Sequence, residues 1–185
     1  MHKMIYDYGK ALHRLSYCLD NFSRMDEAAA ADKLALEKFR LVCSLYFDPL
    51  FDADLAETLY HLSHTEFRKY LTGHDEDFLY SRQAVDVYRD LCNRNPKAYG
   101  LSLYNALWEH AGILHDRADE EGALKTWHEL TDIATQVITD RLYLADALYQ
   151  TCWTLRRLSR HDEAVTVRYQ VCEDLSFCSQ DPFYL

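Results

Sequence analysis

The stretch TGHDEDFLYSRQAVDVYRDL, residues 72–91, indicates the fold class of this 185-residue chain. It opens on Thr72-x-x-Asp75, a hydroxyl three residues before a carboxylate, which is the pattern of a helix N-terminus. It continues into the apolar patch Ala84-Val85-Asp86-Val87-Tyr88-Arg89, which has a counterpart in Ala35-Leu36-Glu37-Lys38-Phe39-Arg40 and weaker copies at Leu130 and Val171. A helix start that leads into a recurring apolar patch predicts a chain of repeated helices.

A second pattern repeats upstream of each such patch. Leu12-His13-Arg14-Leu15-Ser16 recurs as Leu59-Tyr60-His61-Leu62-Ser63, and the run from Leu101 to Leu107 recurs from Leu142 to Leu148. Repeats of 40 to 50 residues indicate a helical array. We expect one repeat domain over residues 1–185. Its four units cover approximately residues 1–48, 49–95, 96–140 and 141–180, and residues 181–185 form the stub of a further unit or a tail folded over the last hairpin.

Each unit is expected to contain two helices. In the first helix, the spacing of Tyr8, Leu12, Leu15, Leu19 and Phe22 predicts an apolar stripe that faces the core. The eight expected helices cover residues 4–23, 26–46, 52–71, 75–93, 97–116, 119–138, 141–158 and 161–178.

Capping signals mark where the second helices start. Ser23-x-x-Asp26 and Ser159-x-x-Asp162 place a hydroxyl at the N-cap, and the third unit offers Asp116 and Asp119-Glu120-Glu121 instead. The helix dipole explains these acidic clusters without a functional role. Pro49 and Pro96 fall between units, where they can end one hairpin and start the next.

Composition excludes several classes of protein. Only 5 glycines and 3 prolines are present, too few for the turns of a sandwich or barrel. The net charge of −10 disfavours nucleic acid and anionic membranes as partners. The six cysteines show no C-x-x-C pairing, and no signal peptide or membrane span is evident, so we expect a cytoplasmic protein with reduced cysteines.

These patterns resemble tetratricopeptide repeats (TPRs), in the long-helix variety similar to kinesin-light-chain-type and fungal signalling-ATPase-associated repeats. Residues 72–91 carry the best match and Ser159-Arg160-His161-Asp162-Glu163-Ala164-Val165 the next. The resemblance covers essentially the whole chain and implies an all-α, right-handed α-α solenoid of about four hairpins. Asp77 and Gly122 depart from the pattern. The family places alanine where this chain has Asp77, and Gly122 falls inside a helix.

The resemblance also implies a concave groove lined by the first helices. The positions after the shared leucines, and those one and two turns further on, then face a partner. Aromatic and arginine side chains there have the composition of binding hot spots. For Trp108 and Trp153 the alternative is packing between hairpins. The predicted groove residues are His13, Tyr17, Tyr60, His64, Arg68, Trp108, Tyr149, Trp153, Arg156 and Arg157. Tyr17, His64, Gly112 and Trp153 stand where the family's carboxylate clamp needs asparagine, so that chaperone-tail function is disfavoured.

Catalytic signatures are weak in this chain. Glu57, His61 and His64 share one helical face at i, i+4 and i+7 and form a candidate metal set. When the repeats are aligned, however, His61 falls at the same position as Arg14, Glu109 and Gln150. Polar residues at this position of every repeat indicate that it faces solvent. No phosphate-binding loop or nucleophile motif is present. The sequence therefore predicts no enzyme, no cofactor and no metal.

The leading hypothesis is a non-catalytic scaffold that binds a protein or peptide segment, for which the acidic charge favours a basic one. The first alternative is a structural segment of a larger regulatory protein, in which the groove packs on neighbouring domains or on a second copy of the chain in a homo-oligomer. A metal-dependent helical enzyme is the remaining alternative.

Overall fold

The computed structural model describes residues 2–46, 48–70, 75–138 and 140–176. Over these residues the chain is all-α, with eight α-helices and one short π-helix, as the repeats predict. Each expected helix is present, with bounds that differ by a few residues. The elements are α1 (His2–Asn21), α2 (Met25–Leu45), α3 (Pro49–Tyr70), α4 (Asp75–Arg94), α5 (Pro96–Asp116), α6 (Glu120–Ile133), η1 (Ala134–Ile138), α7 (Arg141–Arg157) and α8 (His161–Ser176).

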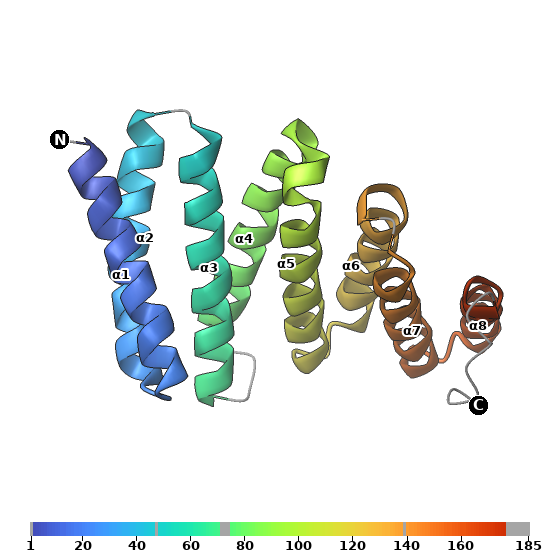
Figure 1. Ribbon diagram of the computed structural model, residues 1–185. Coiled ribbons are helices and arrows are strands. Elements are labelled where there is room, and N and C mark those ends of the chain that lie inside the picture. The colour runs from blue at the N-terminus through green and yellow to red at the C-terminus, as the bar shows by residue number, and fades with distance from the viewer. Residues whose placement is uncertain (1, 47, 71–74, 139, 177–185) are drawn as a thin grey trace.

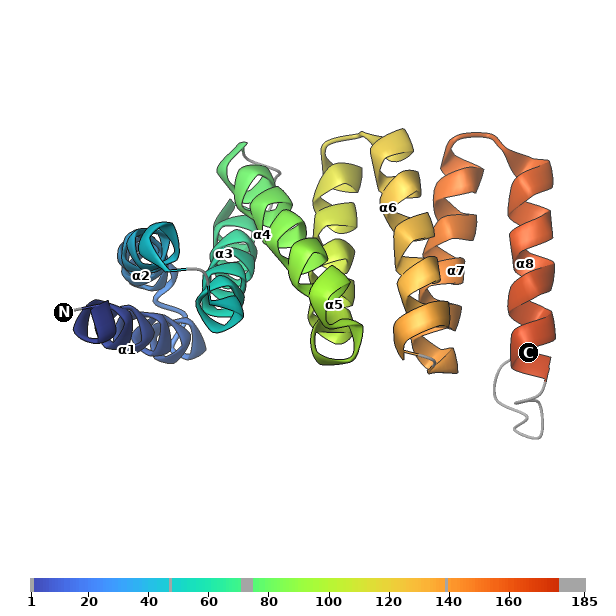
Figure 2. The same cartoon turned by 90° about the horizontal axis from the view of Figure 1, so that it is seen from above.

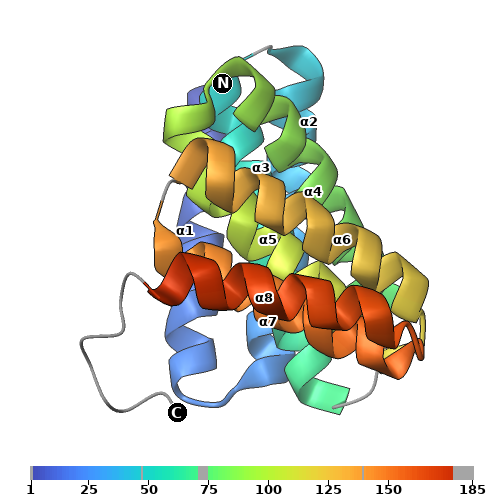
Figure 3. The same ribbon diagram turned by 90° about the vertical axis from the view of Figure 1, so that its right-hand side faces the viewer.

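The helices form an elongated array in which each packs against the next in the chain. Figure 1 shows them side by side from α1 to α8. The first hairpin is seen from the side in Figure 1 and along its axes in Figure 2, and the reverse holds for α7 and α8. The hairpins therefore rotate progressively, which makes the array a twisted solenoid; Figure 3 shows this twist from the α8 end.

The odd-numbered helices make up one layer of the array. Within the described residues the backbones of α1 and α3, and of α3 and α5, lie close together, whereas even-numbered helices meet through long side chains, such as Arg89 of α4 with Glu129 of α6. We call the surface presented by α1, α3, α5 and α7 the odd-helix face. The backbones of α5 and α7 lie further apart; the two helices meet through side chains, such as Tyr104 with Tyr143, and η1 packs against both.

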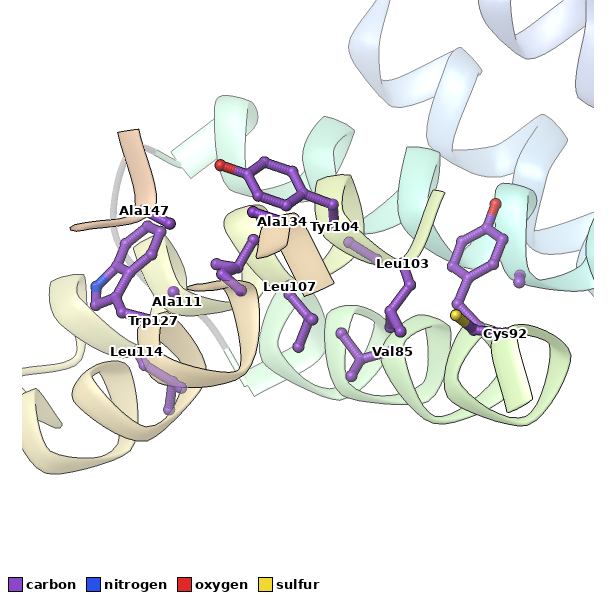
Figure 4. Packing of buried hydrophobic residues seen from close by; sticks show 14 of the residues in the cluster. Val85, Cys92, Leu103, Tyr104, Leu107, Ala111, Leu114, Trp127, Ala134 and Ala147 are labelled. Carbon is purple, nitrogen blue, oxygen red and sulfur yellow. The ribbon is translucent and has the colours of Figure 1, made fainter. Parts of the chain in front are cut away.

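The largest apolar cluster runs from α3 to α7. Leu91, Leu107 and Leu130 are at most 1% exposed, and Trp127 and Ala147 extend the cluster into the last units. Figure 4 shows side chains of this cluster, among them Leu107, Trp127 and Ala147, packed between the helices. Because neighbouring hairpins share this core, each hairpin depends on the next for burial of its apolar face.

The predicted apolar stripe of the first helix is wrong. Tyr8, Leu15 and Phe22 are 53%, 50% and 79% exposed, and the buried positions of α1 are Tyr6, Gly9, His13 and Ser16. The helix is rotated so that a polar strip faces inward. It can do so because His13 and Ser16 find buried hydrogen-bond partners across the hairpin.

The predicted hydroxyl caps of α2 and α8 are also wrong. Ser23 and Ser159 have φ of 58° and 60° and form the turn before each helix. The next residues, Arg24 and Arg160, pair with a glutamate three positions on: Arg160 Nε donates to Glu163 Oε1 at 2.7 Å. The cap expected at Asp119 is confirmed, since its side chain accepts from Gly122 N at 2.9 Å. Thr72 and residues 181–185 lie outside the described residues.

Candidate functional site

A pocket of about 360 Å³ opens on the odd-helix face between α5 and α7. The backbones of α5 and α7 do not approach as closely as those of α1 and α3 or of α3 and α5, and the pocket lies between their facing side chains. Four of the seven lining residues are tryptophans or tyrosines. The lining residues are Trp108, Gly112, His115, Trp127, Tyr149, Gln150 and Trp153.

Ring contacts hold the pocket walls in place. Trp108 packs edge-on against Trp127 with ring centroids 5.0 Å apart, and Trp127 is only 5% exposed. On the opposite wall His115 meets Trp153 edge-on at 4.5 Å. Tyr149 is 63% exposed and forms the rim. The inner rings are thus anchored in the core, while the outer rings remain open to a partner.

A cation already lies on one of these rings. The Arg157 guanidinium sits 4.9 Å from the Trp153 ring centroid, and its Nε donates to Glu120 Oε1 at 2.8 Å. His115 Nδ1 lies 3.1 Å from the same carboxylate. The site therefore combines the electron-rich face of an indole with a carboxylate, the arrangement that favours a positively charged group.

Gly112 keeps the pocket open. A Cβ atom added at Gly112 would meet no heavy atom within 4 Å, so the space beside α5 at this position is unfilled. A larger side chain here would enter the pocket without striking the helices around it. Gly112 is therefore the position from which the pocket can be closed with the least disturbance.

The structure brings three predicted groove residues together in this pocket: Trp108, Tyr149 and Trp153. The packing alternative also holds in part. Trp108 is partly buried against the main core, whereas Trp153 is 37% exposed. Tyr60 is partly buried as well, between the main core and the apolar cluster of α2, α3 and α4.

Two other predicted groove residues, Arg68 and His64, lie elsewhere on the odd-helix face, in contacts between units. Arg68 Nη1 donates to both oxygens of Asp20, at 2.9 and 2.8 Å, and joins α3 to α1. His64 Nδ1 lies 3.2 Å from Glu109 Oε1, and this hydrogen bond raises the pKa of His64. Arg156 is exposed beside Arg157 at the end of α7.

Two further predicted residues, His13 and Tyr17, belong to a different site. His13 of α1, Asp32 of α2 and His61 of α3 meet inside the first three helices. His13 Nδ1 lies 2.7 Å from Asp32 Oδ1, His61 Nδ1 lies 2.6 Å from Asp32 Oδ2, and Ser16 Oγ donates to Oδ2 at 2.7 Å. We call His13, Ser16, Asp32 and His61 the His–Asp cluster.

The His–Asp cluster is sealed from solvent. Asp32 is 0% exposed, His61 4% and His13 8%. Burial alone would raise the pKa of the Asp32 carboxyl, but hydrogen bonds from His13, His61 and Ser16 hold that pKa below its ordinary value. Asp32 is therefore a buried carboxylate stabilised from three sides.

The solvent-facing assignment of His61 is wrong, because α3 packs against both α1 and α2 and its His61 side turns into that junction. The candidate metal set Glu57, His61 and His64 is not assembled either. His61 contacts Asp32, His64 contacts Glu109, and burial together with the charge of Glu57 raises the pKa of Tyr17. The pairing of His61 with Asp32 joins residues from different helices, so no local spacing could have revealed it.

Sequence reasoning also missed Trp127 and Gln150 at the pocket. Trp127 lies on α6, the second helix of a hairpin, and the groove prediction considered only first helices. The sequence carries no separate signal for it, because a large apolar side chain on a helix is usually a core residue. Gln150 falls at the repeat position of His61, which was expected to face solvent. Its place beside the pocket depends on how α7 faces α5.

The chain has a TPR-like fold of repeated helical hairpins. No family model and no curated protein matches the chain. Among solved structures, the apo form of RapI aligns with 95% of this chain and 58% of its own, at 16% identity and a TM-score of 0.72. A de novo designed helical repeat protein, DHR64, aligns with 97% of this chain and 95% of its own, at 14% identity and a TM-score of 0.50.

The chain thus spans 58% of the length of the RapI chain that it resembles. At these identities the likeness establishes the fold and no more. Across the described residues, no helix has the length and apolar character needed to cross a membrane.

Proposed function

We propose that this chain is a non-catalytic scaffold that binds a protein or peptide segment along its odd-helix face. The observation that carries the proposal is the aromatic pocket between α5 and α7, with exposed Tyr149 and Trp153 at its opening. Monomeric proteins rarely expose large apolar patches without a function, and aromatic rings dominate the energetics of binding interfaces. The helical-repeat fold of the solved structures that it resembles supports a scaffold role.

The occupant is a peptide segment that carries an arginine or lysine. The protein has a net charge of −10, which attracts a basic segment. The Trp153 ring already accepts the Arg157 guanidinium on one side, which supports its suitability for a cation. An incoming basic side chain would contact the remaining aromatic faces of the pocket.

The first prediction concerns closure of this pocket. Peptides selected from a random display library on the full chain should be enriched in arginine or lysine, and replacing that residue by glutamine should weaken binding. Gly112→Leu should reduce affinity at least about 30-fold, because loss of a hot-spot contact costs about 2 kcal/mol or more. Tyr149→Ala should weaken binding in the same direction. Isothermal titration calorimetry measures each affinity.

The matched control is Tyr169→Ala, which removes a similarly exposed tyrosine (68%) from α8, outside the pocket. Its affinity should stay within about twofold of the unmodified chain, since interface substitutions outside hot spots cost little. Selected peptides that bind Gly112→Leu as tightly as the unmodified chain would contradict the assignment of the pocket, and a library that yields no binder would contradict the function.

A stripe on α1 supports a second candidate function, self-association. On the helix Met4, Tyr8 and Leu15 are 50% to 70% exposed, and Phe22, in the turn directly after it, is 79% exposed. Together with exposed Ala11 and Cys18 they follow alternating steps of four and three residues, which is the seam spacing of a coiled coil. A second copy of α1 is the occupant that this repeat suits, since two such seams can interlock along their length.

A further inference from the structure

The His–Asp cluster joins three helices through groups that bind metal ions. One ligand atom each from His13, Asp32 and His61 lies within 4.8 Å of the others. Ser16 Oγ adds a fourth polar atom, 2.7 Å from Asp32 Oδ2 and 3.4 Å from His61 Nδ1. Two imidazoles and a carboxylate form a donor set that Zn²⁺ and related transition-metal ions prefer.

The hydrogen bonds inside the cluster are incomplete. The Nε2 atoms of both His13 and His61 are buried and have no hydrogen-bond partner. A buried polar atom without a partner costs free energy, and native proteins rarely leave two such atoms in one cluster. Hydrogen bonds within the protein therefore satisfy only the Nδ1 side of each imidazole, the side that faces Asp32.

Tyr17 covers the cluster on its outer side. Its ring centroid lies 4.0 Å from that of His61 and 5.0 Å from that of His13, and the residue itself is 38% exposed. Rotation of this one surface side chain would give an ion access to a cluster that is otherwise enclosed. Tyr17 therefore belongs to the wall of this site.

We propose that His13, Asp32 and His61 bind a divalent transition-metal ion, with Zn²⁺ as the reference ion and with Ser16 or a water molecule completing the coordination. Zn²⁺ lies about 2.0–2.2 Å from nitrogen and oxygen ligands, so tetrahedral ligand atoms are about 3.4 Å apart. The present contacts of 2.6 and 2.7 Å would open by less than about 1 Å. Small side-chain rotations are sufficient for this change.

The ion would act as a clip between units. Its ligands come one each from α1, α2 and α3, so binding would fix the first hairpin against the start of the second. Each neutral imidazole would bind the ion through Nδ1 and carry its proton on Nε2, and the positive charge of the ion would neutralise the buried carboxylate. A closed, three-helix site of this kind is structural, because bound metal stabilises the folded state that forms it.

The test uses the full chain, stripped with a chelator and dialysed. Titration with Zn²⁺ should show one ion per chain and raise the melting temperature by about 5 to 10 °C at a hundredfold excess over Kd. Mg²⁺ should give no such shift, because it prefers oxygen ligands. His61→Gln and Asp32→Asn should each lower Zn²⁺ affinity at least about tenfold, the scale on which even indirect support of a metal site matters.

The matched control is His64→Gln, one turn along the same helix and outside the cluster. Its affinity should equal that of the unmodified chain. Loss of binding in His64→Gln to the same degree as in His61→Gln, or no binding by the unmodified chain, would overturn the proposal.

A measurement on the unmodified chain keeps the test decisive if a variant fails to fold. Co²⁺ in place of Zn²⁺ should give visible absorption bands without a thiolate charge-transfer band, since no cysteine belongs to the cluster. X-ray absorption fine structure of the Zn²⁺ form should show two imidazoles and oxygen. A thiolate band or sulfur ligands would place the ion at the cysteines and contradict the assignment.

Discussion

Two glycines on α5 differ in what their surroundings require of them. A Cβ atom added at Gly100 would lie 2.3 Å from Val137 Cγ1, so the close approach of η1 to α5 requires glycine there. At Gly112 on the same helix, a Cβ atom would meet nothing within 4 Å. The same residue type is therefore a packing requirement at one end of α5 and an opening at the other.

This contrast predicts opposite effects of the same substitution. Gly100→Ala should lower the free energy of unfolding by about 1–3 kcal/mol, because the stiff Val137 side chain must be displaced. Gly112→Ala should raise it by about 0.5–1 kcal/mol, because alanine favours the helix and fits the open space. Urea denaturation of both variants measures the change. Shifts of the two midpoints in the same direction would contradict this account of η1 packing.

At the scale of elements, three hairpins share one turn. Ser23, Ala118 and Ser159 all have positive φ, at 58°, 59° and 60°. After Ala118, Asp119 N donates to Leu114 O at 2.9 Å, and the same bond recurs from Arg24 to Leu19 and from Arg160 to Leu155. This left-handed turn closes the first helix of each hairpin, so the hydroxyl residue ends one helix instead of capping the next.

A residue other than glycine is strained in such a turn, which leads to a further prediction. Ala118→Gly should raise the free energy of unfolding by about 0.5–1 kcal/mol, since it relieves the clash of Cβ with the backbone. Ala30→Gly, at an exposed position inside α2, should lower it by about 1 kcal/mol. Thermal and urea unfolding compare the two variants. A loss of stability in Ala118→Gly comparable to that in Ala30→Gly would argue against the strained turn.

At the scale of the whole molecule, the interior changes character along the array. From α5 to α7 the core is apolar, whereas the junction of α1, α2 and α3 combines apolar clusters with buried His13, Asp32 and His61. This polar junction turns apolar residues of α1 outward. The two ends of the solenoid therefore offer different surfaces, an apolar helical seam on α1 and an aromatic pocket between α5 and α7.

The seam predicts concentration-dependent self-association. Sedimentation velocity over a wide range of concentration should show a dimer that Leu15→Glu weakens, because the charge would be buried between two copies of α1. Leu142→Glu, which replaces an even more exposed leucine (70%) on α7, should leave the equilibrium unchanged. A monomer at all concentrations would exclude this candidate function and leave the peptide pocket unaffected.

The number, order and approximate bounds of the helices could be predicted from the sequence, because helical spacing, prolines at junctions and acidic helix starts act over a few neighbouring residues. Trp108, Tyr149 and Trp153 were likewise found as candidate binding residues from their repeated positions. These properties depend on local chemistry, which the order of residues carries directly.

Tertiary packing alone set which face of α1 is buried and that His61 meets Asp32 and His13. The buried face and the cluster depend on the rotation of a helix about its axis and on partners 16 to 48 residues away, such as Ser16 with Asp32 and Arg68 with Asp20. A polar residue can face inward when such a partner exists, whereas hydropathy alone counts it as exposed. For the same reason the His–Asp cluster and the contribution of Trp127 to the pocket could not be predicted from the sequence.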